Sequence, residues 1–525
     1  MITGKNIIGN SYSNNGDKTY RTFNPVKNEE NPASFFEANE SEINTAVQLA
    51  TEAFKDYRNT SGKDKAAFLR TIAEEILNLG EELIDMYCME SGLPKGRAEG
   101  ERGRTVNQLR AFADLLEEGS WVEATIDNAI PDREPLPKSD IRKMNIPLGP
   151  VAVFGSSNFP FAFSTAGGDT ASALAAGCPV IVKAHPMHSG TSEMVGKAII
   201  TAANKTNMPE GVFSNLNSSG IEVGQKLVSH PKIKAVGFTG SIKGGRALFD
   251  LAAKREEPIP VFAEMGSINP VVIFPSVLED ENSNWTTQLA NSINLGAGQF
   301  CTNPGLIFGI EGSDLDHFTT RLGEELAALD SGSMLHPSIH SSFKNGVHEV
   351  LNEKEVSTIA ENKEGLKPNY AAQKLVTVAG SEFLSNKKLH KEVFGPFSMV
   401  VKCKDEEELL NIVNNLEGQL TGTVLCDSKE ISKYASIIEA LQNRVGRIIF
   451  NGVPTGVEVC PSMMHGGPYP ASTDSRYTAV GTHAIARWVR PFTFQDWPND
   501  ALPKELQDGN PLDIVRLVDG NVTKQ

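Results

Sequence analysis

The sequence predicts an α/β fold with a doubly wound parallel sheet, a second α/β domain and a small β-structured arm. Between residues 149 and 266, short apolar runs alternate with segments of helical periodicity, the pattern of successive βαβ units. A second alternation begins at residue 270. Near the end, 483–498 (HAIARWVRPFTFQDWP) mixes β-branched and aromatic residues and suits an edge strand that pairs with another subunit. At 525 residues, the chain is too long for one core.

The first elements in chain order are helices. Apolar residues recur at helical spacing over 41–59, behind the N-cap candidate Ser41, and again over 64–92, which ends at Gly92. A further helix is expected over 97–119. It carries an unusual set of arginines, which form either a solvated face or a local anion site: Arg97, Arg102, Arg104 and Arg110.

The alternating region then supplies the elements of both sheets. For the first sheet we expect strands within 149–157, 179–184, 211–216, 233–240 and 259–266, with helices over 163–177, 189–206, 221–230 and 241–255. For the second we expect strands over 270–274, 398–403 and 422–426, with helices around 284–296, 314–328 and 406–416.

Composition excludes several classes of protein. The excess of 65 acidic over 49 basic side chains gives a net charge of −16, which disfavours binding to nucleic acid or to a membrane surface. The start of the chain has no apolar stretch of signal-peptide length, and no run of about 18 apolar residues occurs anywhere. The six cysteines lack CxxC spacing, which argues against a zinc site or a disulfide framework and suits a reducing cytoplasm.

Four polar features stand out at predicted strand ends and in one loop. Ligands of doubly wound sheets bind beyond the carboxyl ends of the strands. Asn158 offers an amide donor there, Gly240 and Ser241 offer free backbone N–H groups at a helix start, and Glu264 offers a carboxylate. Cys301 lies in the glycine-rich stretch LGAGQFCTNPG. Taken singly, each has a structural alternative as a turn, cap or packing residue; together they suit acyl chemistry on a thiol.

Six motifs in order resemble the aldehyde dehydrogenase family over nearly the full length: SNFPF, PVIVKAHP, FTGSIKGG, EMGSINP, GQFCTNPG and EVFGP. The resemblance implies a homodimer or homotetramer that acts on a small-molecule aldehyde. It also implies a Rossmann-type cofactor domain at 1–125 and 149–266, a catalytic domain at 267–478, and an oligomerisation arm with C-terminal tail at 126–148 and 479–525.

The resemblance also implies the chemistry. Cys301 would attack the aldehyde carbon to give a thiohemiacetal, with its oxyanion held by the Asn158 amide and the Cys301 backbone N–H. Hydride transfer to a nicotinamide would leave a thioester, and Glu264 would deprotonate the water that releases the acid. The glycines of LGAGQF would let the backbone approach both ligands. No metal is implied.

The implied cofactor is NADP or NAD, with NADP favoured. Lys183 matches the residue that reaches the adenosine ribose, and Pro186 stands where many NAD-preferring members carry a glutamate. Without that carboxylate a 2′-phosphate is not repelled, and His185 is placed to bind it; alternatively, His185 and His188 merely pack. Further matches form the pyrophosphate turn (Gly240, Ser241, Gly245) and the nicotinamide-ribose contact (Glu392, Phe394).

Three longer stretches, including HGGPYPASTDSRYTAVG, resemble a branch of 2-oxoglutarate semialdehyde (2,5-dioxopentanoate) dehydrogenases and NADP-linked fatty aldehyde dehydrogenases. For the anionic substrate, Arg104 is the preferred counter-charge and Arg102 the next. Apolar walls are expected from Phe159, Phe161, Phe163 and Phe300. Two rivals are a non-catalytic binding protein, which would have lost Cys301 or Glu264, and a cysteine hydrolase, which needs a histidine partner that no motif indicates.

Overall fold

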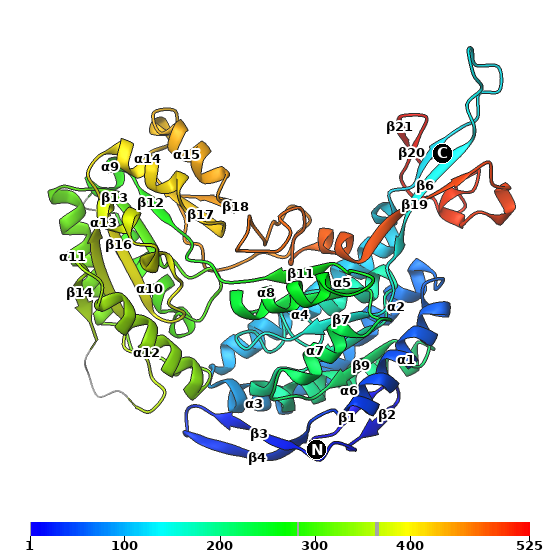
Figure 1. Cartoon of the computed structure of the whole chain (residues 1–525), viewed down its shortest axis with the longest axis horizontal. Coiled ribbons are helices and arrows are strands. Elements are labelled where there is room, and N and C mark those ends of the chain that lie inside the picture. The colour runs from blue at the N-terminus through cyan, green and yellow to red at the C-terminus, as the bar shows by residue number, and fades with distance from the viewer. Residues whose placement is uncertain (1, 281–282, 363–366, 525) are drawn as a thin grey trace.

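The computed structural model describes residues 2–280, 283–362 and 367–524. Two lobes lie side by side, one around each of two seven-stranded sheets, and a slender arm extends from the first lobe (Figure 1). This arrangement confirms the predicted α/β class. No helix within the described ranges is long and apolar enough to span a membrane.

The first sheet is doubly wound. Its strand order is β11-β10-β7-β8-β9-β1-β2, in which β7 to β11 are parallel and the two N-terminal strands close one edge antiparallel. The order reverses beside β7, which is the switch point where such sheets bind ligands. The strands are β1 (Asn6–Ile8), β2 (Ser11–Ser13), β7 (Val151–Phe154), β8 (Val180–Lys183), β9 (Phe213–Leu216), β10 (Ala235–Thr239) and β11 (Val261–Glu264).

Alternate side chains of this sheet enter two different cores. On β7, Val151 and Val153 face one core, and Ala152 and Phe154 face the other. Because both faces are buried, the strands read as continuous apolar runs. One face is covered by α1 (Glu40–Tyr57), α7 (Glu222–Ser229) and α8 (Ile242–Ala253), and the other by α2 (Gly62–Asn78), α3 (Gly80–Ser91), α4 (Lys95–Glu118), α5 (Gly168–Ala176) and α6 (Ser189–Lys205).

Three details differ from the predicted helices. The N-cap of α1 is Asn39 rather than Ser41, because Asn39 and Glu42 form a reciprocal capping box. The helix expected over 64–92 divides at Leu79 into α2 and α3, next to Gly80 with a φ of 57°. The helix expected over 163–177 begins only at α5, since the chain before it turns tightly.

The second sheet has the order β14-β15-β16-β13-β12-β17-β18, parallel except for β14. Sequence patterns missed α12, β14, β15 and α13, which lie between the expected helix at 314–328 and the expected strand at 398–403. They also missed β13, β18, α9 and α15. The elements are β12 (Val271–Ile273), β13 (Leu306–Ile310), β14 (Ser357–Glu361), β15 (Lys374–Ala379), β16 (Phe397–Cys403), β17 (Gln419–Leu425), β18 (Val445–Phe450), α9 (Pro275–Leu278), α10 (Trp285–Asn294), α11 (Ser313–Ala327), α12 (Pro337–Leu351), α13 (Gly380–Ser385), α14 (Glu406–Asn414) and α15 (Ala435–Gln442).

The arm is a separate five-stranded sheet with the order β19-β6-β5-β20-β21. Strand β19 (Val489–Gln495) pairs antiparallel with β6 (Ile141–Pro147) of the same chain and ends the sheet. The other members are β5 (Thr125–Asp127), β20 (Arg516–Val518) and β21 (Asn521–Thr523), and a two-stranded ribbon of β3 (Thr19–Asn24) and β4 (Glu29–Phe36) lies near the N-terminus. The exact domain boundaries stay a prediction.

Candidate active site

Cys301 lies in a tightly wound loop between α10 and β13. Three successive residues before it, Gly296, Ala297 and Gly298, have φ between 55° and 66°, a left-handed conformation that favours glycine. A Cβ on Gly298 would lie 2.1 Å from the carbonyl carbon of Gly395. The glycine there is therefore required by the neighbouring backbone of the chain itself, a different reason from the approach of ligands that the sequence suggested.

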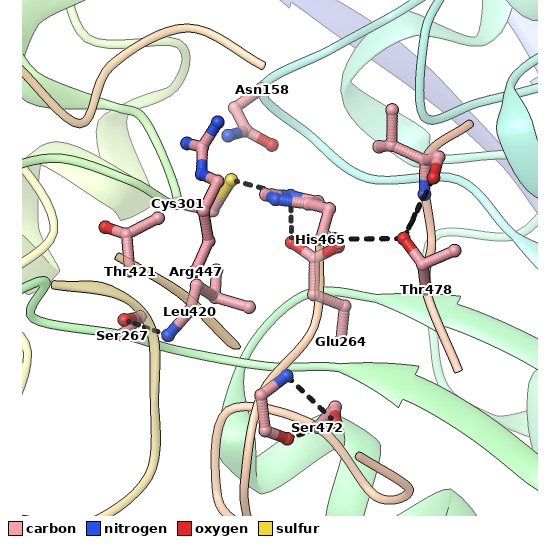
Figure 2. A network of polar contacts seen from close by, with 12 residues as sticks. Asn158, Glu264, Ser267, Cys301, Leu420, Thr421, Arg447, His465, Ser472 and Thr478 are labelled. Carbon is pink, nitrogen blue, oxygen red and sulfur yellow. Dashed lines mark hydrogen bonds and ion pairs between the residues drawn. The ribbon is translucent and has the colours of Figure 1, made fainter. Parts of the chain in front are cut away.

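The thiol of Cys301 contacts a histidine and, through it, a carboxylate (Figure 2). The Sγ atom lies 3.6 Å from Nε2 of His465, and the same nitrogen lies 3.0 Å from Oε1 of Glu264. The side chains of His465 and Glu264 are only 1% and 4% exposed. The structure thus brings together the predicted Cys301 and Glu264 with His465, the first residue of the stretch HGGPYPASTDSRYTAVG, to which the sequence had assigned no catalytic role.

His465 is held over Glu264 by the segment that follows it. Its backbone N–H donates to Oγ1 of Thr478 at 2.9 Å, and its carbonyl accepts from Ala479 N–H at 2.8 Å. Further along, the N–H of Met265 donates to the carbonyl of Ala471 at 2.8 Å, so the segment runs beside the end of β11. The stretch HGGPYPASTDSRYTAVG carried this signal, but the sequence alone did not show that it reaches Cys301.

The surroundings of Cys301 disfavour the thiolate in the ligand-free chain. Burial raises the pKa of the Cys301 thiol well above its usual value, the Glu264 carboxylate raises it further, and Arg104 opposes the rise. The thiol is therefore neutral at pH 7 and needs a proton acceptor before it can act as a nucleophile. Nε2 of His465 is the ring nitrogen in contact with the sulfur, and it can accept the proton when the ring proton is on Nδ1.

Two amides position groups beside the thiol. Asn158 follows β7 and lies next to the sulfur (Figure 2), with its Nδ2 donating to the carbonyl of Gln299 at 3.1 Å. Asn269 follows β11 and donates through Nδ2 to the carbonyl of Cys301 at 2.8 Å and to that of Asn303 at 2.9 Å. Asn269 therefore fixes the backbone that presents the thiol, a role that the sequence did not reveal.

Two arginines lie close to the thiol. Arg104 of α4 packs over the ring of Phe163 at 5.3 Å, and its buried Nε and Nη2 have no hydrogen-bond partner within the described part of the chain. Arg447 of β18 extends its guanidinium toward Cys301 and Asn158 (Figure 2), and its buried Nε also lacks a hydrogen-bond partner among the residues that the structure describes. Burial lowers the pKa of Arg104 and of Arg447, and the charge of a Cys301 thiolate counteracts this in both. Sequence reasoning missed Arg447.

The other predicted substrate contacts divide into two groups. Phe159, Phe163 and Phe300 form one aromatic cluster, and the Phe163 ring centroid lies 5.9 Å from that of His465. Phe161 instead packs on Tyr87, with ring centroids 4.8 Å apart, inside the large core. Arg102, the second choice for an anion contact, donates to the carbonyl of Gly80 at 2.9 Å and supports the α2–α3 junction.

The predicted dinucleotide contacts lie at the carboxyl ends of β8 and β10. Burial lowers the pKa of Lys183 to about 8. Ser241 caps α8 by accepting from Gly244 N–H at 3.2 Å, and Gly240 precedes it. Gly245 lets α8 approach β11, because a Cβ there would lie 2.7 Å from Met265. An exposed helix start preceded by glycine fits a phosphate group.

His185 and His188 have different environments. Nδ1 of His185 accepts from the N–H of Met187 at 3.3 Å, so Nε2 carries the ring proton. Burial lowers the pKa of His185 well below its usual value, which leaves a neutral donor rather than a cation. Nε2 of His188 lies 2.7 Å from the carbonyl of Ser156, and this fully buried ring packs against that of His185. His188 is therefore a packing residue, as the second interpretation of the sequence expected.

Glu392 and Phe394 line a cavity next to the Cys301 loop, together with Ser267 and Gly298. Burial raises the pKa of Glu392 to about 7, and the backbone N–H of Ser267 opposes the rise. A Cβ on Gly266 would lie 2.6 Å from Oε2 of Glu392, so the glycine makes room for the carboxylate at the end of β11. A buried carboxylate with few donors fits a partner that offers hydroxyl groups.

Comparisons with known proteins identify the family of the chain. The model of the aldehyde dehydrogenase family matches residues 12–487. The chain is 48% identical to alpha-ketoglutaric semialdehyde dehydrogenase 2 of Azospirillum brasilense over 99% of both chains. It is 44% identical to alpha-ketoglutaric semialdehyde dehydrogenase of Acinetobacter baylyi, over 100% of this chain and 98% of that one.

Solved structures show the same fold at lower identity. Betaine aldehyde dehydrogenase of Staphylococcus aureus, solved in complex with NAD+, superposes with a TM-score of 0.81 at 19% identity, over 95% of this chain and 97% of that chain. The 1-pyrroline-5-carboxylate dehydrogenase from Thermus with bound NAD gives 0.79 at 20% identity, over 94% and 92%. With the family model matching most of its length, the chain belongs to the aldehyde dehydrogenase family.

Proposed function

We propose that this enzyme oxidises 2-oxoglutarate semialdehyde to 2-oxoglutarate at Cys301. The observation that carries the proposal is the set of groups around one sulfur atom: His465 and Glu264 on one side, and the guanidiniums of Arg104 and Arg447 nearby. A nucleophile, a base and a counter-charge for an anionic aldehyde are thereby close together. The names of the two relatives at 48% and 44% identity support the same substrate.

In the proposed reaction, the Cys301 sulfur attacks the aldehyde carbon while His465 accepts the thiol proton. The Asn158 amide and the Cys301 backbone N–H stabilise the oxyanion of the thiohemiacetal. After oxidation to the thioester, Glu264 deprotonates the attacking water, and the acid leaves as the thiol is restored. At 4% exposure, the Glu264 carboxylate is shielded from bulk water.

A nicotinamide cofactor would supply the hydride acceptor. Lys183 and His185 would hold the adenosine ribose, the α8 start at Gly240 and Ser241 would hold the pyrophosphate, and Glu392 with Phe394 would hold the nicotinamide ribose. We propose that NADP serves at least as well as NAD, since Pro186 offers no carboxylate against a 2′-phosphate. A value of kcat/KM for NAD more than about a hundredfold above that for NADP would contradict this preference.

The two arginines account for substrate choice. Their unpartnered buried N–H groups gain a partner when a carboxylate binds, and a charged hydrogen bond contributes about 1.5–3 kcal/mol, a preference of roughly ten- to a hundredfold. The aromatic cluster of Phe159, Phe163 and Phe300 favours a second candidate substrate, an alkyl aldehyde. The two candidate substrates differ in whether the end of the molecule opposite the aldehyde group carries a charge.

The test compares 2-oxoglutarate semialdehyde with pentanal in wild type and in Arg104→Met and Arg447→Met, which keep length and remove charge. We expect at least one variant to raise KM for the semialdehyde ten- to a hundredfold and to spare pentanal. Arg110→Met, exposed on the same helix as Arg104, is the matched control. Equal losses on both aldehydes would refute carboxylate recognition, and a wild-type preference for long alkyl aldehydes would favour the fatty-aldehyde alternative.

We further propose a homodimer or homotetramer assembled through the arm, and a reducing, cytoplasmic setting. The outermost strand β19 is mostly exposed, and Phe492 and Trp497 in and after it are 38% and 51% exposed. Large exposed aromatic side chains on an edge strand are typical of pairing with another chain. All six cysteines are free, as in proteins that work among reduced thiols.

A further inference from the structure

Three side chains that zinc prefers as ligands meet at the thiol. The Sγ of Cys301, the ring nitrogen of His465 and a carboxylate oxygen of Glu264 all lie within 4.8 Å of one another. They come from positions 264, 301 and 465, so no local spacing such as CxxC could reveal them. Thiolate, imidazole and carboxylate with one open position form the donor set of many zinc centres with three protein ligands.

Two of the three ligand–ligand distances are close to the edges of a zinc tetrahedron. Bonds of about 2.3 Å to sulfur and about 2.0 Å to nitrogen place those two ligand atoms roughly 3.5 Å apart. The observed Sγ–Nε2 distance is 3.6 Å. The Nε2–Oε1 distance of 3.0 Å is a few tenths of an ångström short of the corresponding edge, a shift that one carboxylate rotation supplies. These two edges need only small shifts to accept a metal ion, and the sulfur–carboxylate edge lies within 4.8 Å.

The cluster also lacks other partners for a cation to displace. Apart from the contacts within the cluster, both carboxylate oxygens of Glu264 and the Nδ1 of His465 are buried without a hydrogen bond among the described residues. Cys301 is half-buried, which leaves one side open for a water as fourth ligand. Because Nδ1 has no outer partner to orient the ring, we expect an affinity about 10–100-fold below that of a fully supported site.

We propose that Cys301, His465 and Glu264 form a binding site for Zn²⁺, and that the ion reversibly closes the active site. Binding forms a zinc–sulfur bond in place of the S–H bond of Cys301, and the proton goes to solvent. The sulfur lone pair is then no longer available to an aldehyde. Hard ions such as Mg²⁺ prefer oxygen ligands and should leave the enzyme unaffected.

The test uses thiol alkylation, which needs neither substrate nor cofactor. Chelator-treated enzyme is exposed to iodoacetamide with and without equimolar or tenfold Zn²⁺, and modification of Cys301 is read by peptide mass spectrometry. We expect zinc to protect Cys301 and to inhibit aldehyde oxidation over the same concentration range. EDTA should reverse both effects, and Mg²⁺ should cause neither. Since protection is measured on the thiol itself, this result is independent of which aldehyde the enzyme oxidises.

Variants distinguish zinc binding at this cluster from zinc binding elsewhere on the protein. In His465→Asn, Cys301 is still alkylated, though more slowly, and half-protection should need at least ten times more zinc. His483→Asn, which removes an exposed histidine, is the matched control. In this variant, zinc should protect Cys301 at the same concentrations as in wild type. Co²⁺ should give a thiolate charge-transfer absorption that Cys301→Ser abolishes. Absence of protection in wild type, or undiminished protection in His465→Asn, would overturn the proposal.

Discussion

At the scale of single residues, the central feature is that one nitrogen serves two partners. Nε2 of His465 contacts both the Cys301 sulfur and the Glu264 carboxylate, at 3.6 Å and 3.0 Å. The sequence identified Cys301 and Glu264 through their motifs, because each follows a recognisable strand or loop. It could not identify His465 or Arg447, because their importance comes only from which segments the fold brings together.

His465 should control the ionisation of the thiol. We expect His465→Asn to lower kcat by about a hundredfold or more, within the usual contribution of a positioned proton acceptor. Burial and Glu264 raise the pKa of Cys301, so without the imidazole the thiolate should form only at higher pH. The check is the pH profile of Cys301 alkylation, which should move upward in the variant. An unmoved profile with lowered activity would mean that His465 is merely structural.

Cofactor affinity should depend on pH in both directions. Glu392 accepts strong, charge-assisted hydrogen bonds from hydroxyl groups only when it is ionised. Its pKa is about 7, so KM for the cofactor should rise as the pH falls below about 7. Lys183 donates only when protonated, and its pKa is about 8, so KM should also rise as the pH climbs above about 8. Glu392→Gln should remove only the rise in KM at low pH. A KM that stays flat across this range would contradict the assigned contacts.

At the scale of elements, strands with two buried faces were the easiest to predict. Each strand of the first sheet from β7 to β11 falls within an apolar run, since alternate residues enter two cores. In the second sheet this rule was less reliable, because the buried strand β13 was missed. The elements between α11 and β16 were missed as well. There β14 is an exposed, antiparallel edge strand and α12 buries only Phe343 and Val350, so neither shows the apolar periodicity of a core element.

The loop before Cys301 should be intolerant of side chains at Gly298. Gly298→Ala places a Cβ 2.1 Å from Gly395 in a left-handed backbone, so we expect a loss of several kcal/mol of stability or a displaced thiol. Gly100→Ala in α4 is the matched control. Its Cβ would meet nothing within 4 Å, and helix propensity predicts a gain of about 0.5–1 kcal/mol. Thermal unfolding and Cys301 alkylation rate report both effects; wild-type values for Gly298→Ala would contradict this account.

At the scale of the whole molecule, the arm is the part whose exposed side chains suggest contact with a second chain. Its outermost strand β19 is mostly exposed, although it is paired with β6 along its length. The sequence predicted an edge strand here from its β-branched and aromatic residues. It did not predict that β6 of the same chain is its partner, because the two strands are far apart in sequence.

If β19 joins subunits, a charge on its exposed face should separate them. We expect Phe492→Asp to shift the enzyme toward a lighter species in sedimentation velocity. Tyr12→Asp, at a comparably exposed aromatic residue on the far edge of the first sheet, should leave the mass unchanged. A monomeric wild type, or an unchanged oligomer in Phe492→Asp, would contradict the proposed role of the arm.

The central claim is that the Cys301 sulfur carries the acyl group derived from 2-oxoglutarate semialdehyde. The most direct measurement is mass spectrometry of Glu264→Gln after brief exposure to this aldehyde and NADP. Because the variant lacks the base for hydrolysis, the thioester should accumulate on the Cys301 peptide, with one burst of reduced cofactor per chain and no turnover. Cys301→Ser should show neither adduct nor burst. Full steady-state activity in either variant, or an adduct on another cysteine, would contradict the account.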